Sequence, residues 1–81
     1  MTWSYYQETK TGDYILVRDV SRKPSRGNLL DAAGPDEPGD PDSAAWDMVT
    51  EKFLREDCLR VDEQNVPKEW REALSAVVGG Q

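Results

Sequence analysis

Two alternating runs of aromatic and β-branched residues open the chain and restrict its fold more than any other feature. They span Thr2 to Val20 and are joined by the pair Thr11-Gly12. Alternation puts every second residue on one face of a strand, so Trp3 and Tyr5 share a face. Glycine supplies the positive φ that a short hairpin turn with a bulge requires. The sequence therefore predicts an N-terminal β-hairpin.

The second of these runs is apolar on both faces. Tyr14 and Leu16 share one face, whereas Ile15 and Val17 lie on the other. An edge strand of an antiparallel sheet usually alternates more cleanly between apolar and polar residues. We therefore expect the second run to be a central strand.

A segment rich in proline and glycine follows, from Ser21 to Ser43. Its seven such residues argue against a continuous helix or a central strand. They are Pro24, Gly27, Gly34, Pro35, Pro38, Gly39 and Pro41. Only Asn28-Leu29-Leu30 has the composition of a short strand or of an anchor to the core. We expect a mobile, solvated surface loop at about residues 31–42.

The segment from Ser43 to Asp57 fits two descriptions. Its apolar residues have the spacing of one helical face, and Ser43 or Asp42 is a suitable N-cap. These apolar residues are Trp46, Val49, Phe53 and Leu54. The alternative is a strand over Trp46 to Val49 followed by a shorter helix that begins at Thr50. We prefer the single helix.

The end of the chain predicts a strand and then a helix. The residues from Cys58 to Asp62 alternate like a strand, and Pro67 suits the first position of a helix. A continuous apolar stripe follows, made of Trp70, Ala73, Leu74, Val77 and Val78. The expected fold is a single α+β domain, in which a small antiparallel sheet led by the N-terminal hairpin packs against two helices.

The length and composition are those of a small globular domain. Three Trp, three Tyr and one Phe supply large buried areas to a chain of 81 residues. We expect each tryptophan to anchor the core, unless one stays at the surface as an interface anchor. No leader and no apolar run of roughly 20 residues is present, so we expect a cytoplasmic protein without membrane contact.

The residues of the chain argue against enzymatic activity. There is no histidine, which is the commonest general acid–base and metal ligand. The single cysteine, Cys58, excludes an internal disulfide and fits a reducing compartment. Glu56 and Asp57 precede it, and neighbouring acids raise the pKa of a thiol and suppress the reactive thiolate. We expect a structural cysteine rather than a nucleophile.

Charge is distributed unevenly along the chain. From Lys10 to Arg26, five basic residues outnumber two acids, a net of +3, whereas from Leu29 to Val66 eleven acids outnumber three basic residues, a net of −8. The acidic part repels phosphates, so direct binding of nucleic acid is disfavoured. The loop residues Arg22, Lys23 and Arg26 are weak evidence for phosphate binding. More simply, they keep the loop soluble or pair with the acidic segment of this or another chain.

The leading functional hypothesis is a non-enzymatic protein-interaction module. It would be a small acidic adaptor or inhibitor of bacterial or phage type that binds a basic protein surface. In one sub-case, its carboxylates would mimic the charge of nucleic acid. It would be a monomer or a weak homodimer, without cofactor. The candidate contact residues are Asp31, Asp36, Glu37, Asp40, Asp42, Glu56, Asp57, Asp62 and Glu63. The acids from 36 to 42 lack the spacing of a calcium loop, so no metal is expected.

The last three residues offer a second hypothesis. Gly79-Gly80-Gln81 resembles the end of the prokaryotic ubiquitin-like modifier of actinobacteria, whose terminal glutamine is deamidated and joined to a lysine of a target protein. The turn Thr9-Lys10-Thr11-Gly12 is similar to the first hairpin turn of ubiquitin. These resemblances imply a protein tag conjugated through its C-terminus. The plainer reading is that the helix ends near Gly79.

Overall fold

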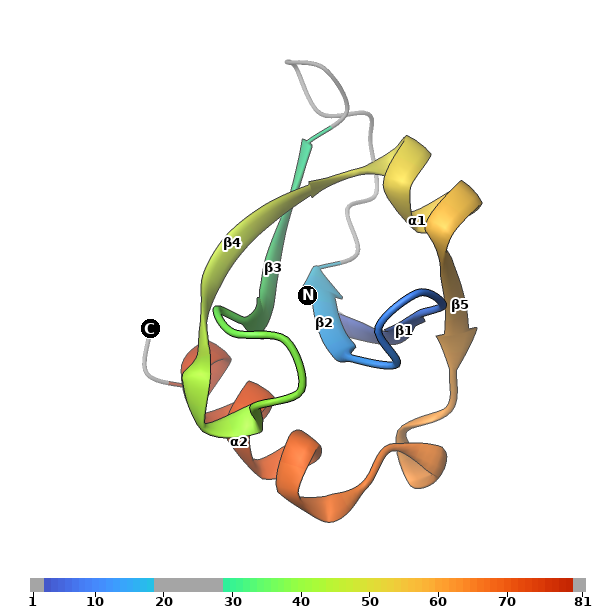
Figure 1. Ribbon diagram of the computed structural model, residues 1–81. Helices are drawn as coiled ribbons and strands as arrows, with labels where there is room; N and C mark the ends of the chain where they lie inside the picture. Colours follow the sequence, from blue (N-terminus) through green and yellow to red (C-terminus); the bar gives the residue numbers. More distant parts are fainter. Residues whose placement is uncertain (1–2, 19–28, 80–81) are drawn as a thin grey trace.

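A five-stranded antiparallel sheet forms the centre of the molecule (Figure 1). The computed structural model describes residues 3–18 and 29–79. The strands run in the spatial order β4-β3-β2-β1-β5. Their bounds are β1 Trp3–Glu8, β2 Tyr14–Arg18, β3 Leu29–Pro35, β4 Ala44–Thr50 and β5 Cys58–Val61. The helices are α1 Glu51–Asp57 and α2 Lys68–Gly79, with short 3₁₀ turns η1 Pro41–Ser43 and η2 Glu63–Asn65. The α+β prediction is confirmed.

The predicted N-terminal hairpin is present. β1 pairs with β2 in the register Tyr5 opposite Leu16, and the turn closes through the Glu8 N–H, which donates to the Asp13 carbonyl at 2.8 Å. Gly12 has φ 78°, the left-handed conformation that the turn required of it. β2 lies in the middle of the sheet, as its two apolar faces predicted.

The predicted surface loop is wrong over residues 31–35, because these residues belong to β3. β3 lies between β2 and β4 and is covered on both faces, with Ala32, Ala33 and Gly34 buried. A Cβ at Gly34 would lie 2.9 Å from the Ile15 Cγ2 atom, so only glycine allows this close approach. Pro35 is tolerated because it ends the strand. The loop itself is confined to residues 36–43.

The single helix over residues 43–57 is also wrong, and the alternative description is correct. Ala44 to Thr50 forms β4, and the Thr50 hydroxyl accepts a hydrogen bond from the Phe53 N–H at 3.0 Å as the N-cap of α1. Pairing with β3 supplies β4 with backbone hydrogen bonds that the apolar spacing alone does not reveal.

Thr50→Ala distinguishes the two descriptions by the sign of its effect on stability. In the observed fold the substitution removes an N-cap and is expected to lower the free energy of unfolding by about 1 kcal/mol. Inside a continuous helix, alanine would instead stabilise the protein by a few tenths of a kcal/mol. Urea unfolding of the two proteins measures the difference, and a more stable Thr50→Ala variant would refute the N-cap.

The sheet is curved, as the connection from β4 to β5 requires. These strands are opposite edges of the sheet and would lie about 19 Å apart if it were flat. Only the seven residues of α1 join them, and such a helix is about 10 Å long. Figure 1 shows the resulting curl, with α1 joining the two edges.

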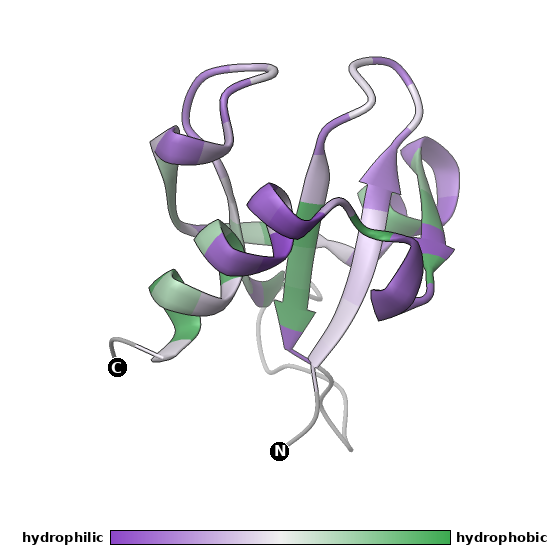
Figure 2. Ribbon diagram, turned by 90° about the horizontal axis from the view of Figure 1, so that it is seen from below, coloured by the Kyte–Doolittle hydropathy of each residue, from purple (hydrophilic) through white to green (hydrophobic). Residues whose placement is uncertain are grey.

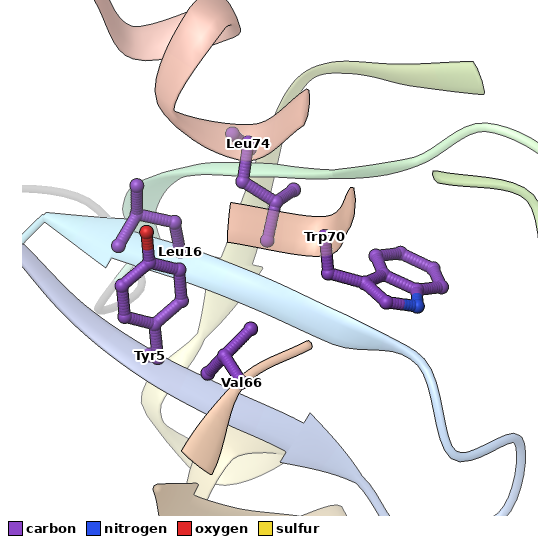
Figure 3. Close-up of a cluster of buried hydrophobic side chains, with 6 residues drawn as sticks. Tyr5, Leu16, Val66, Trp70 and Leu74 are labelled. Carbon is purple, nitrogen blue, oxygen red and sulfur yellow. The ribbon is translucent and has the colours of Figure 1, made fainter. Parts of the chain in front are cut away.

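Each face of the sheet carries its own helix and its own part of the core. α2 covers one face, where its buried residues Trp70 and Leu74 pack on Tyr5, Leu16 and Ala33 (Figure 3). α1 covers the other face, where Leu54 packs with a second cluster. That cluster consists of Ile15, Val17, Leu30, Ala32, Leu54 and Cys58. The helix predicted from the C-terminal apolar stripe is confirmed, although Pro67 precedes its first residue and Gly79 is its last.

Candidate functional site

Six of the nine predicted contact residues gather at one end of the sheet. We call this end, which surrounds the β1–β2 turn, the acidic end. The Asp13 carboxylate in that turn accepts a hydrogen bond from the Gly39 N–H at 2.7 Å, and the Thr9 N–H donates to the Asp57 carbonyl at 2.9 Å. These bonds hold the β3–β4 connection and the end of α1 against the turn. The acidic end comprises Asp36, Glu37, Asp40, Asp42, Glu56 and Asp57.

The other three predicted residues lie elsewhere. Asp31 is on β3 and forms an ion pair with Arg18 at 3.2 Å. Asp62 and Glu63 follow β5, which starts beside the acidic end at Cys58 and runs away from it. The topology therefore divides the predicted acidic surface into a compact group of six and three separate carboxylates.

Hydrogen bonds within the β3–β4 connection define its shape. The Ser43 hydroxyl donates to the Asp40 carbonyl at 2.7 Å and accepts from the Glu37 N–H at 2.9 Å. The Asp40 carboxylate caps η1 by accepting from the Asp42 N–H at 2.9 Å. Figure 2 shows this hydrophilic connection beside the β1–β2 turn, at the same end of the sheet. The carboxylates of residues 36 to 42 are thus displayed on a hydrogen-bonded turn.

Among the described residues, few ion pairs form at the acidic end, although Lys10 lies in the turn that it surrounds and Arg55 lies in the last turn of α1. Among its six carboxylates, Glu56 alone forms an ion pair within the part of the chain that the structure describes, with Lys52 at 3.9 Å. Within the same residues, no three His, Cys, Asp or Glu side chains are grouped so that they could hold a metal ion. The arrangement therefore offers concentrated negative charge, which attracts cations and basic surfaces through long-range electrostatics.

Cys58 is buried at the start of β5 and is poorly suited to act as a nucleophile. Its pKa is raised from 9.0 to about 11, first by burial and then by the negative charges of Glu8 and Asp57. The thiol is therefore protonated at neutral pH. Because the thiolate is the nucleophilic form of cysteine, the protonated thiol is unreactive. Sequence reasoning named Asp57 but missed Glu8, which reaches Cys58 because the two residues pair across β1 and β5.

A second surface feature lies away from the acidic end, where Trp3 meets Trp46. The ring centroids are 5.8 Å apart and the rings are tilted by 54°. Trp3 is half-buried, whereas Trp46 is 40 % exposed. Trp70 is buried against Tyr14, so the three tryptophans have three different environments. Trp46 is the surface tryptophan that the sequence left open as an alternative.

Two grooves flank this tryptophan pair, and Trp3 and Val78 line both of them. One groove has a volume of about 430 Å³ and carries Asp62 and Glu63 on its wall. The other has a volume of about 660 Å³ and runs beside β4, where Asp31 and Asp47 lie close to Trp46 and Met48. Both grooves therefore combine carboxylates with the ring of Trp3, and an arginine also lines each of them, Arg60 in the first and Arg18 in the second.

Some predicted features lie outside the described residues. These are the basic residues Arg22, Lys23 and Arg26 and the C-terminal Gly80 and Gln81. Gly79 is the exposed end of α2. None of the helices in residues 3–18 and 29–79 is long and apolar enough to cross a membrane.

Comparisons with protein-family models, with curated proteins and with solved structures found no match for this chain.

Proposed function

We propose that the protein is a non-enzymatic interaction module that binds a basic surface of another protein through its acidic end. The observation that supports this proposal is the convergence of six carboxylates from two separate segments on one turn. Because most of these charges are unpaired in the described residues, they produce a field that reaches about 10 Å into solution at 0.1 M salt. Such fields steer basic partners and select against acidic ones.

The hydrogen bonds of the β3–β4 connection suggest that its carboxylates bind a partner and do not only keep the protein soluble. Loops that become ordered only on binding lose conformational entropy, which weakens the complex. Here the Ser43 and Asp40 bonds already define the turn, and the Asp13 carboxylate holds it to the β1–β2 turn. A preorganised array of carboxylates also fits one sub-class of the proposal, an inhibitor that occupies the phosphate site of a nucleic-acid-binding protein.

A matched pair of variants tests the proposal. Glu37→Gln/Asp42→Asn removes two charges from the acidic end, and Asp62→Asn/Glu63→Gln removes the same residue types elsewhere. None of these four side chains forms a hydrogen bond among those described in the fold, so both variants should retain it. The protein, tagged at its N-terminus, is used to isolate partners from a lysate of its source cells. Their amounts are compared by mass spectrometry.

We expect the first variant to retain about tenfold less of a basic partner, because each exposed charge contributes up to about 1 kcal/mol. The control variant should capture the same amount as the unmodified protein. Equal losses in the two variants would mean that net charge acts without a defined site, and a loss confined to Asp62→Asn/Glu63→Gln would contradict the proposal.

A conjugated tag is the second candidate function. One observation favours it: apart from the neighbouring residues and backbone of α2 itself, no described residue lies within 4 Å of the position that a Cβ at Gly79 would occupy. On a denaturing gel of the same isolate, conjugation would give a ladder of heavier bands that all carry the tag. Deleting Gly80 and Gln81 would abolish the ladder, whereas non-covalent partners would migrate without the tag.

A further inference from the structure

Around Trp46, no strand of residues 3–18 and 29–79 covers the outer backbone edge of β4. The Asp36 N–H donates to the Ser43 carbonyl at 3.0 Å, which identifies this pair as hydrogen-bonded in the antiparallel ladder. By alternation, the backbone groups of residues 44, 46 and 48 point away from β3. Two bonds agree with this assignment: the Ala44 N–H donates to the Pro41 carbonyl, and the Met48 N–H donates to the Asp47 carboxylate at 2.8 Å.

The outward backbone groups, of which the Ala44 and Met48 N–H already have acceptors within the chain, lie beside exposed apolar side chains. β4 is the last strand of the sheet, and no strand of the described residues pairs with its outer edge. Trp46 and Met48 lie on the same face of β4 and are 40 % and 54 % exposed. Both line the groove of about 660 Å³. A strand added to β4 would therefore place alternate side chains over this groove.

The charges of the groove favour a basic ligand. Arg18 and Asp31 neutralise each other across 3.2 Å, which leaves the carboxylate of Asp47 without a cationic partner in the described residues. The exposed ring of Trp46 can accept a Lys or Arg side chain over its face. An incoming strand that takes the Met48 N–H would also release the Asp47 carboxylate, which could then pair with a positive charge of the ligand.

We propose that β4 binds an extended, basic segment of another protein by strand addition, with a Lys or Arg side chain of that segment against Trp46. This site is separate from the acidic end and goes beyond the function proposed above. A second copy of the chain is a poorer occupant. Each copy has a charge of −6, and pairing two β4 strands about Asp47 would place like charges opposite each other.

The probe for the experiment is a displayed library of random octapeptides, selected against the immobilised full-length protein. The best peptide is then titrated into ¹⁵N-labelled protein. We expect selected peptides to alternate β-branched residues with Lys or Arg, and to shift the amide signals of residues 44, 46 and 48. Replacing the basic residues of the peptide by glutamate should abolish binding.

Two substitutions at Met48 test the backbone contact. Met48→Pro removes the outward N–H without removing a hydrogen bond to β3, whereas Met48→Leu retains it. We expect Met48→Pro to weaken peptide binding about tenfold and Met48→Leu to leave it within twofold. If Met48→Pro fails to fold, Asp47→Lys tests the charge contact with the peptide instead. We expect Asp47→Lys to weaken peptide binding about tenfold relative to Asp47→Asn.

Three results would overturn the proposal. The first is the absence of any enriched peptide. The second is a set of shifted signals at the acidic end or in the groove that carries Asp62. The third is self-association through β4 without peptide binding, which would identify a second copy as the occupant. Glu37→Gln/Asp42→Asn, which alters only the acidic end, should change the affinity for the peptide less than threefold. The peptide site is therefore tested independently of the acidic-end proposal.

Discussion

Leu74→Ala is expected to lower the free energy of unfolding by about 2–5 kcal/mol. Leu74 is 0 % exposed and belongs to the buried cluster in which α2 packs on Tyr5 and Leu16 of the sheet (Figure 3). Removing its isopropyl group would leave a cavity that the helix and the sheet cannot fill without moving. Small domains have little stability to lose, so part of the population should be unfolded at 37 °C.

Leu59→Ala is the matched control, because the same atoms are removed from a side chain that is 62 % exposed on β5. We expect it to change stability by less than about 0.5 kcal/mol. Urea unfolding followed by tryptophan fluorescence measures both variants. Similar losses at the two positions would show that α2 does not pack on the sheet as described.

Cys58 is expected to react with an aromatic disulfide reagent about 100-fold more slowly in the folded protein than in the urea-unfolded chain at pH 8. The thiolate is the reacting form, and raising the thiol pKa from 9.0 to about 11 reduces its population by about that factor. Burial of the side chain slows the reaction further. Equal rates in the two states would contradict the buried position of Cys58.

The same pKa shift makes a prediction about stability in alkaline solution. Between about pH 9 and 11 the unfolded chain releases the thiol proton, whereas the folded protein retains it. The contribution of this group is therefore fully present below pH 9 and is lost as the pH rises toward 11. Cys58→Ser, whose hydroxyl does not titrate in this range, should remove that component of the pH dependence.

Elements that depend on local sequence were predictable. The β1–β2 hairpin has its turn and both alternating strands within a few residues, and the stripe that starts at Trp70 marks α2 without reference to the rest of the chain. β3 was missed because its buried residues Ala32, Ala33 and Gly34 are small, a composition typical of loops. For Gly34, the close approach of Ile15 from β2 explains the absence of a side chain.

β4 was given only as the alternative to a single helix, for a different physical reason. The apolar residues Trp46 and Val49 fit a helix and a strand equally well, and the choice is made by hydrogen bonds to β3. Since β3 had itself been interpreted as a loop, the strand had no partner in the sequence-based account. Thr50, an N-cap residue three positions before Phe53, was the local signal in favour of the shorter helix.

The members of the acidic surface were predictable, but their grouping was not. Sequence position puts Asp57 nearer to Asp62 than to Asp42, whereas the fold places Asp57 and the β3–β4 connection against the same turn. Asp13 was missed because the Gly39 N–H that it binds is 26 residues away along the chain. The number of charged residues can be counted in a sequence, but their grouping in space depends on the topology of the fold.

The dependence of partner affinity on salt tests the central proposal most directly. A protein captured by the tagged chain would be purified, and its dissociation constant measured from about 0.05 to 0.5 M sodium chloride. If the acidic end is the contact surface, the affinity should fall at least about tenfold over this range, and much less with Glu37→Gln/Asp42→Asn. An affinity that is independent of salt would contradict the proposal.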